Sequence, residues 1–304
     1  MWALTHYEAS YLKLSLPELT ARAQKARERL SACTLCPWNC IVNRPQGGKG
    51  HCRAPAEAVV SGFNAHFGEE PPLVGHGGSG TIFFSHCNLD CVFCQNWEIS
   101  HHGEGREILP DELARIMLVL QQRGCHNINL VTPSPHIAPI LDALLPAREQ
   151  GLKIPLVYNC GGYESVATLR LLEGIVDIYM PDFKYGENAA AELCSGPPDY
   201  PSRARRALQE MQHQVGDLQV NETGIAKRGL LVRHLVLPGG LAGTEEVVRF
   251  LANEISPRCA VNIMGQYYPA YRAGQYPPLD RRVTSQEVRE ARNIAAAAGL
   301  HLVG

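Results

Sequence analysis

The chain has 304 residues, of which 45% are hydrophobic and 19% are charged, and its formal net charge is −2 at pH 7. This length suffices for one large domain, or for one domain with an appendage, and the apolar content allows a sizeable core. A net charge so close to zero argues against a dedicated nucleic-acid-binding protein or a protein of anionic membrane surfaces.

No apolar run approaches the roughly 20 residues that span a bilayer, and the first residues lack the basic and apolar regions of a signal peptide. We therefore expect a cytoplasmic protein that binds neither membrane nor nucleic acid. In that reducing compartment, the 11 cysteines indicate metal ligands more readily than disulfides. Most of them form two tight clusters. Four isolated ones are expected to be small core residues: Cys125, Cys160, Cys194 and Cys259.

The first predicted helix covers residues 17–31. Pro17 stands in its first turn after Ser15, and apolar residues then recur at helical spacing. The opposite face is basic, which we interpret as a solvated surface.

The first cysteine cluster follows this helix at the spacing C-x2-C-x3-C-x11-C: Cys33, Cys36, Cys40 and Cys52. Four thiolates can close a tetrahedral metal site, and the glycines before Cys52 let the backbone turn back toward the other three. The spacing predicts a bound metal and leaves open whether it is zinc or an auxiliary iron–sulfur cluster. His51 is a lesser candidate ligand, and four unligated thiols are the alternative.

Residues 66–80 are rich in Gly and Pro, which predicts a boundary between two parts of the chain. An N-terminal segment, residues 1–79, would carry the first helix and the four-cysteine site. Residues 80–304 would form the main domain. Glu69 and Glu70 in this connection are candidate active-site acids, although we expect the more common arrangement, an exposed loop pair.

The second cysteine cluster has the spacing C-x3-C-x2-C and directly follows a predicted buried strand: Cys87, Cys91 and Cys94. Three thiols are one short of the set that holds an electron-transfer cluster or a structural zinc. On a cubic 4Fe–4S cluster they leave one iron with an open coordination position, which can bind a substrate or cofactor. A zinc site completed by His86 or a distant residue is one alternative, and chance clustering is another.

After residue 80, β-branched runs alternate with helical patterns, which is typical of a parallel sheet covered by helices. Strands are predicted near residues 81–86, 127–132, 154–158, 176–182, 230–237 and 260–264. Helices are predicted near residues 110–123, 137–150, 163–173, 187–214 with a break at Gly196, 244–254 and 284–298. Six β/α units fall short of the eight that close a full barrel.

In parallel β/α folds, active residues gather at the carboxyl ends of the strands. The second cysteine cluster follows the first of these strands, as that rule requires. Asp182 and Lys184 follow the fourth and share one face by strand alternation. They can bind the two charged ends of a zwitterion, and a surface ion pair is the alternative.

The second cysteine cluster, with Phe93 directly before Cys94, resembles the signature of the radical S-adenosylmethionine (SAM) superfamily. The resemblance implies an open, partial (β/α)6 barrel and a 4Fe–4S cluster whose open iron is chelated by SAM. An electron from the reduced cluster would split SAM and release a 5′-deoxyadenosyl radical. It also implies that Phe93 packs near the adenine, while the protein binds, orients and excludes solvent.

Over residues 80–264, the order of the later motifs resembles the activating enzymes of the pyruvate formate-lyase type. Asn159 matches the family's Thr-Asn-Gly turn and is implied to contact SAM. Asp182 and Lys184 match its Asp-x-Lys motif. Arg233 matches the arginine of a strand before Pro-Gly, and it is implied to hold a carboxylate or ribose through its planar fork.

The chain departs from that pattern in two places. The family's Gly-Gly-Glu loop, which grips the SAM amino group, is replaced by a Thr-Pro-Ser-Pro-His loop. Its candidate SAM contacts are Thr132, Ser134 and His136. For His136, a place at a helix start without a catalytic part is the alternative. Tyr267 stands near the position of a family histidine, so that role is not transferred.

The resemblance implies an oxidoreductase that abstracts hydrogen from a glycine of a partner glycyl radical enzyme. An electron donor such as flavodoxin or ferredoxin would be required. The altered loop and the four-cysteine segment suggest an alternative, direct modification of a small molecule or peptide. The non-enzymatic alternative is a binding module that is stabilised by metal at both cysteine sites and catalyses no reaction.

Overall fold

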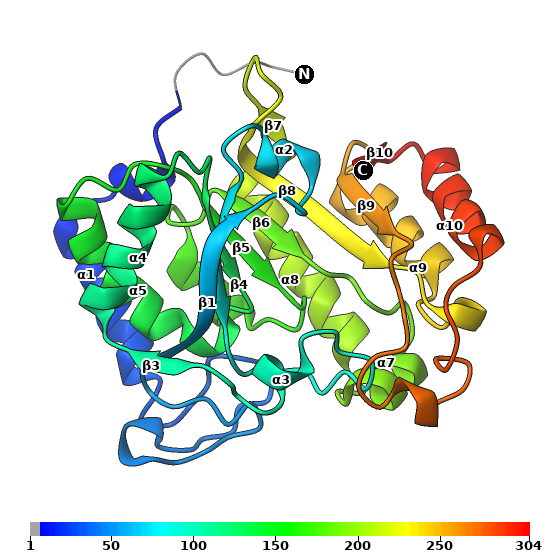
Figure 1. Ribbon diagram of the computed structural model, residues 1–304, viewed down its shortest axis with the longest axis horizontal. Coiled ribbons are helices and arrows are strands. Elements are labelled where there is room, and N and C mark those ends of the chain that lie inside the picture. Colours follow the sequence, from blue (N-terminus) through cyan, green and yellow to red (C-terminus); the bar gives the residue numbers. More distant parts are fainter. Residues whose placement is uncertain (1–6) are drawn as a thin grey trace.

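The computed structural model describes residues 7–304 and is built around one large, open sheet (Figure 1). The strand order is β10-β9-β8-β6-β5-β4-β2-β1-β3, with β7 paired to β8. Because the two ends of this order do not pair within residues 7–304, the described sheet does not close into a barrel. The strands are β1 (Ala58–His66), β2 (Ser79–Phe84), β3 (Arg106–Ile108), β4 (Ile128–Val131), β5 (Leu156–Cys160), β6 (Ile178–Pro181), β7 (Gln219–Val220), β8 (Ala226–Leu235), β9 (Ala260–Met264) and β10 (His301–Leu302).

The six strands predicted after residue 80 are all present. They are β2, β4, β5, β6, β8 and β9, and each runs parallel to its neighbour. A short parallel strand, β10, extends the sheet beside β9. The mixed α/β class and the parallel sheet are therefore confirmed.

Strand β1 was not predicted, and it extends the sheet on the other side. It pairs antiparallel with β2, and β3 pairs antiparallel with β1. The predicted boundary between residues 79 and 80 falls inside β2, directly after its first residue, and β1 on the N-terminal side belongs to the same sheet. The division into an N-terminal segment and a main domain remains a prediction.

The longer helices lie along the outer side of the sheet (Figure 1). The helices are α1 (Leu16–Glu28), α2 (Pro71–Val74), α3 (Trp97–Ser100), α4 (Pro110–Gln122), α5 (Ile137–Glu149), α6 (Val166–Leu169), α7 (Asn188–Ser195), α8 (Tyr200–Val215), α9 (Thr244–Phe250) and α10 (Ser285–Ala297). Ser15 and Glu18 form a capping box at α1, which fixes where that helix begins. Gly196, at φ 99°, separates α7 from α8 at the predicted break. Among residues 7–304, no helix is long and apolar enough to cross a membrane.

The two faces of the sheet bury different side chains because alternate residues of a strand point in opposite directions. Tyr158 and Tyr179 belong to the main core, which includes the helices. Val157 and Ile178, their neighbours in sequence, belong to a second core on the inner face, which Leu73 of α2 enters. The short helix α2 therefore fills the inside of the curved sheet.

Candidate active site at the carboxyl ends of the parallel strands

The three thiols of the second cysteine cluster lie in the loop that leaves the carboxyl end of β2. Cys87, Cys91 and Cys94 are free cysteines, and Cys91 is buried. The amide of Leu89 donates to Cys87 Sγ at 3.4 Å. The backbone of this loop is anchored on the end of α7, where the Asp90 amide donates to the Ser195 carbonyl at 3.0 Å.

Two serine hydroxyls lie beside the thiols. Ser195 Oγ is 2.9 Å from Cys91 Sγ, and Ser100 Oγ is 3.0 Å from Cys94 Sγ. Sequence reasoning missed both. No local pattern marks Ser195, because it lies 104 residues from Cys91 in the chain and only the fold brings them together.

The surroundings shift the pKa values of Cys91 and Cys94 in opposite directions. Burial raises the pKa of Cys91 to about 11, although the Lys184 ammonium opposes this. Burial also acts to raise the pKa of Cys94, but hydrogen bonds from His101 and Ser100 outweigh it and lower that pKa. His101 was another residue missed from sequence.

The donor set fits a group held by thiolates. Each of the three sulfurs has a hydrogen-bonding neighbour, which is the Leu89 amide for Cys87, Ser195 for Cys91 and His101 for Cys94, and Lys184 lies close enough to influence Cys87 and Cys91. Such donors stabilise the deprotonated form that a metal requires. Within residues 7–304, no three His, Cys, Asp or Glu side chains are arranged to hold a single metal ion.

Four predicted site residues meet at the ends of β5, β6 and β8. Arg233 Nε donates to Asp182 Oδ1 at 2.9 Å, and its Nη2 donates to Asn159 Oδ1 at 2.7 Å. Lys184 Nζ donates to the other oxygen of Asp182 at 2.6 Å. We call Asn159, Asp182, Lys184 and Arg233 the polar cluster.

The polar cluster is not a surface ion pair. The side chains of Asp182, Lys184 and Arg233 are 16–18% exposed. Burial acts to raise the pKa of Asp182, but Arg233 and Lys184 outweigh it and hold that pKa below its usual value. Asp182 therefore remains a carboxylate between two cations, as the zwitterion-binding prediction requires.

The expectation that Glu69 and Glu70 form an exposed loop pair is wrong. Glu70 is 5% exposed and accepts a hydrogen bond from Asn262 Nδ2 of β9 at 3.1 Å. Glu69 lies 3.7 Å from Arg233 Nη1. Burial raises the pKa of Glu69 to about 7, although Arg233 opposes this. Their position follows from α2, which carries the connection beneath the inner face of the sheet.

The loop after β4 turns most of its polar side chains inward. Ser134 donates to the carboxylate of Glu164, which is itself buried. His136 is fully buried, with Nε2 2.7 Å from the Ser85 carbonyl. Burial lowers the pKa of His136 to about 3. Of the three candidates in this loop, only Thr132 is partly exposed, and the assignment of a SAM contact among them stays a prediction.

Three aromatic or histidine side chains near the site are held by protein contacts. Phe93 is 5% exposed and packs edge-on against Tyr267 at 5.7 Å. The Tyr267 hydroxyl donates to the Leu279 carbonyl at 2.6 Å. His234 is fully buried between the Phe183 carbonyl and Thr244, as expected for a structural residue.

The four cysteines of the N-terminal segment lie together. Burial raises the pKa of Cys52, and the neighbouring thiols of Cys33 and Cys40 add to this. The pKa of Cys36 is raised in the same way, by burial and then by the neighbouring thiols of Cys52 and Cys33. Backbone amides donate to three of the sulfurs: Trp38 to Cys36, His51 to Cys40 and Ala54 to Cys52. The second metal site nevertheless stays a prediction.

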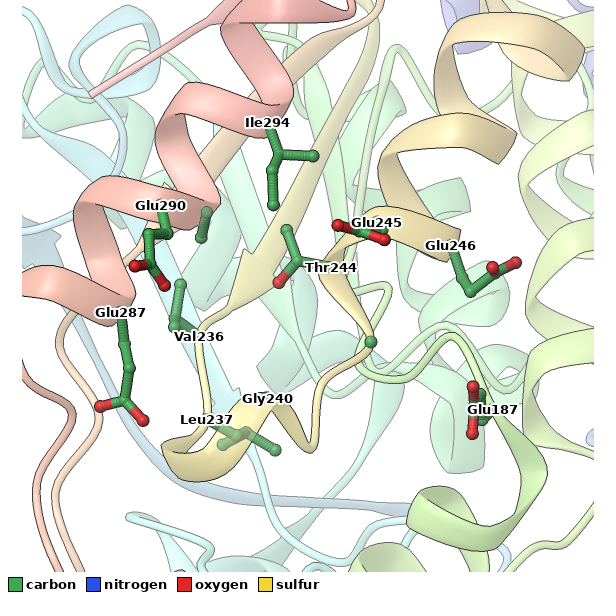
Figure 2. A pocket seen from close by; sticks show the side chains of 12 residues that line it. Glu187, Val236, Leu237, Gly240, Thr244, Glu245, Glu246, Glu287, Glu290 and Ile294 are labelled. Carbon is green, nitrogen blue, oxygen red and sulfur yellow. The ribbon is translucent and has the colours of Figure 1, made fainter.

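A separate pocket of about 360 Å³ opens between β8, α9 and α10, away from the thiols (Figure 2). Five glutamates line it: Glu187, Glu245, Glu246, Glu287 and Glu290. Glu287 is already engaged, because it accepts hydrogen bonds from the Gly239 amide and from Arg281. None of the predicted site residues lines this pocket.

Comparison with known proteins places these motifs in a family. Residues 81–225 match the model of the radical SAM superfamily. The chain is 33% identical to the uncharacterized protein MJ0674 of Methanocaldococcus jannaschii, over 97% of this chain and 83% of that protein. It is 22% identical to a pyruvate formate-lyase-activating enzyme of Clostridium pasteurianum, over 57% of this chain and 68% of that enzyme.

Two solved structures are also similar to parts of this chain. A radical SAM methyltransferase from Sphaerobacter thermophilus matches with a TM-score of 0.45 and 16% identity, over 72% of this chain and 65% of that one. SuiB from Streptococcus suis, bound to the precursor peptide SuiA, matches with a TM-score of 0.48 and 14% identity, over 72% and 46%. The chain thus spans less than two thirds of either solved chain. With the family match, the relatives and the thiol loop at the carboxyl end of β2, this chain belongs to the radical SAM superfamily.

Proposed function

We propose that this radical SAM protein activates a glycyl radical enzyme by abstracting hydrogen from a glycine of that partner. The family implies a 4Fe–4S cluster and SAM, and Cys87, Cys91 and Cys94 would hold the cluster. When bound, the two groups together supply radical hydrogen-abstraction chemistry. The observation that carries the proposal is the polar cluster, whose Lys184 lies close enough to influence Cys91.

The polar cluster would bind the amino-acid end of SAM. The Asp182 carboxylate suits an ammonium group, while Lys184 and Arg233 suit a carboxylate. Asn159 accepts from Arg233 through Oδ1, which leaves its Nδ2 to donate to a ligand. These residues would bind and orient SAM beside the thiols and exclude water from it.

A protein target is supported by two observations. Leu73 and the inner core fill the inside of the sheet below the polar cluster, so a target has to be presented from the carboxyl ends of the strands. A loop of another protein can approach in that way. The similarity to a pyruvate formate-lyase-activating enzyme, although partial, points to a glycine as the site of abstraction.

Direct modification of a small molecule or peptide is the second candidate. The loop after β4 favours it, because Ser134 and His136 are committed to protein partners and the loop lacks the family's Gly-Gly-Glu sequence. In either case a cytoplasmic flavodoxin or ferredoxin would deliver the electron.

We also propose that Cys33, Cys36, Cys40 and Cys52 bind a second metal, either zinc or an iron–sulfur cluster. The amides that point at three of these sulfurs support this, because such donors stabilise thiolates. Elemental analysis distinguishes the two: one zinc per chain indicates a structural site, and about eight irons per chain indicate a second cluster.

The decisive experiment combines anaerobically reconstituted protein, SAM, a strong reductant and candidate glycyl radical enzymes. We expect 5′-deoxyadenosine release and a glycine-centred doublet in electron paramagnetic resonance (EPR) spectra. Cys91→Ala should abolish both, while Cys125→Ala, outside both clusters, should retain them. Release of 5′-deoxyadenosine without a doublet for any partner would favour the second candidate. Release of 5′-deoxyadenosine by Cys91→Ala at the wild-type rate would contradict both candidate functions.

A further inference from the structure

The two cysteine sites are in direct contact through side chains other than their cysteines. His51 directly precedes Cys52, and Asp90 directly precedes Cys91. His51 Nε2 lies 2.8 Å from Asp90 Oδ2. The backbone amide of the same histidine donates to Cys40 Sγ at 3.3 Å. One residue of the four-cysteine segment thus touches both a thiol of its own site and the loop that carries the other.

A second contact runs parallel to the first. Trp38 Nε1 donates to the carbonyl of Asn88, between Cys87 and Asp90, at 2.8 Å. The Trp38 ring stacks on the His51 ring, with centroids 3.9 Å apart and planes inclined by 20°. The stack fixes the two contacting side chains relative to each other. The thiol loop is therefore held at two points by one rigid pair.

The other carboxylate oxygen of Asp90 faces His101, which in turn contacts the thiol loop. His101 Nδ1 lies 3.7 Å from Asp90 Oδ1, and His101 Nε2 lies 3.2 Å from the Cys91 carbonyl. His101 also hydrogen-bonds Cys94. Asp90 thus stands between a histidine of the four-cysteine segment and a histidine that contacts a thiol of the second cluster.

The strength of the His51–Asp90 pair is not what matters here. The two side chains are 24% and 39% exposed, and partly exposed ion pairs contribute little to stability. The contact between His51 and Asp90 matters because it positions Asp90, which directly precedes Cys91 and orients His101. Groups that orient the ligands of a metal centre commonly affect its affinity and properties.

The position of His51 depends in turn on the four thiols. Regular structure between Cys33 and Cys52 consists of one short 3-10 turn, Arg44–Gln46. A segment this small buries too little apolar surface to order itself, so a bound metal would supply much of its order.

We propose that the four-cysteine segment, through His51 and Trp38, positions the thiol loop, so that metal at the first site governs the geometry of the cluster at the second. This inference rests on the two metal sites proposed above. It assigns His51 and Trp38 as positioning residues. It also predicts that the two sites are not independent.

The test uses full-length, anaerobically reconstituted protein and reads the EPR spectrum of the reduced cluster with and without SAM. We compare His51→Ala, His51→Gln, Trp38→Phe and Cys36→Ser. His213→Ala, an exposed position on α8, is the matched control. His51→Ala should keep the first metal, alter the spectrum and its response to SAM, and release 5′-deoxyadenosine on the order of ten-fold more slowly.

His51→Gln, which retains a donor for Asp90, should restore much of the wild-type spectrum, and Trp38→Phe should lie between the two. Cys36→Ser should lose the first metal and reproduce the His51→Ala spectrum. If Cys36→Ser does not fold, the comparison of His51→Ala with His51→Gln decides the test.

Two results would overturn the inference: a His51→Ala spectrum identical to the wild type, or a wild-type protein with no metal at the first site. Neither result would contradict the proposed function. That function is contradicted separately if wild-type protein with an intact cluster releases no 5′-deoxyadenosine.

Discussion

Arg233 Nε donates to Asp182 Oδ1 at 2.9 Å and joins the carboxyl end of β8 to that of β6. The same guanidinium reaches Asn159 on β5 at 2.7 Å. One planar side chain therefore spaces three strand ends, and it does so beside the thiol loop. Lysine has a single ammonium and cannot reproduce two bonds in this fixed geometry.

Arg233→Lys should weaken SAM binding more than it changes stability. Loss of one charge-assisted hydrogen bond costs about 1.5 kcal/mol or more, so the Kd for SAM should rise on the order of ten-fold. Isothermal titration with the reconstituted protein measures this. Arg289→Lys, at an exposed position of α10, is the control. An unchanged Kd in Arg233→Lys would remove the polar cluster from the SAM site.

Ser195→Ala should make the cluster harder to reduce. Ser195 Oγ lies 2.9 Å from Cys91 Sγ and 2.6 Å from the Tyr185 hydroxyl. Hydrogen bonds to cluster sulfurs are one of the factors that set reduction potentials. Removal of this donor leaves more negative charge on the sulfur, so the midpoint potential should become more negative. An EPR-monitored redox titration reports the shift, and Ser202→Ala on the exposed side of α8 should show none.

His136 should make the protein sensitive to acid. Burial lowers its pKa from 6.5 to about 3, so the folded state binds fewer protons than the unfolded state between these values. Stability should therefore fall as the pH drops below 6.5, by about 2 kcal/mol at pH 5 from this residue alone.

His136→Gln tests that expectation, because glutamine can still donate to the Ser85 carbonyl and does not titrate. Denaturant unfolding of both proteins at pH 7.5 and pH 5 gives the comparison, and other titrating groups cancel in the difference. The wild type should lose stability relative to His136→Gln at the lower pH. A constant difference would mean that His136 takes up its proton equally in the folded and unfolded states, and that burial does not keep it neutral.

The six parallel strands, the thiol loop and the Asp182–Lys184 pair could be predicted because their signals are local. Strand runs, cysteine spacing and alternation all act within a few residues of sequence. The Ser195 contact with Cys91 and the burial of Glu69 could not, since each depends on segments far apart in the chain. Strand β1 was missed for a different reason. A bulge between Val60 and Gly62 breaks its pairing register, and with it the regular pattern by which a strand is recognised.

Strand β1 also has a practical consequence for dissecting this protein. It covers the edge of β2, whose Ile82 and Phe84 are almost fully buried. A chain that starts at residue 80 would lose this cover and offer unpaired backbone groups next to apolar side chains, which invites edge-to-edge association. We expect such a fragment to aggregate on expression, as light scattering of any recovered material would reveal. Attempts to purify the catalytic part alone should therefore retain residues 58–66.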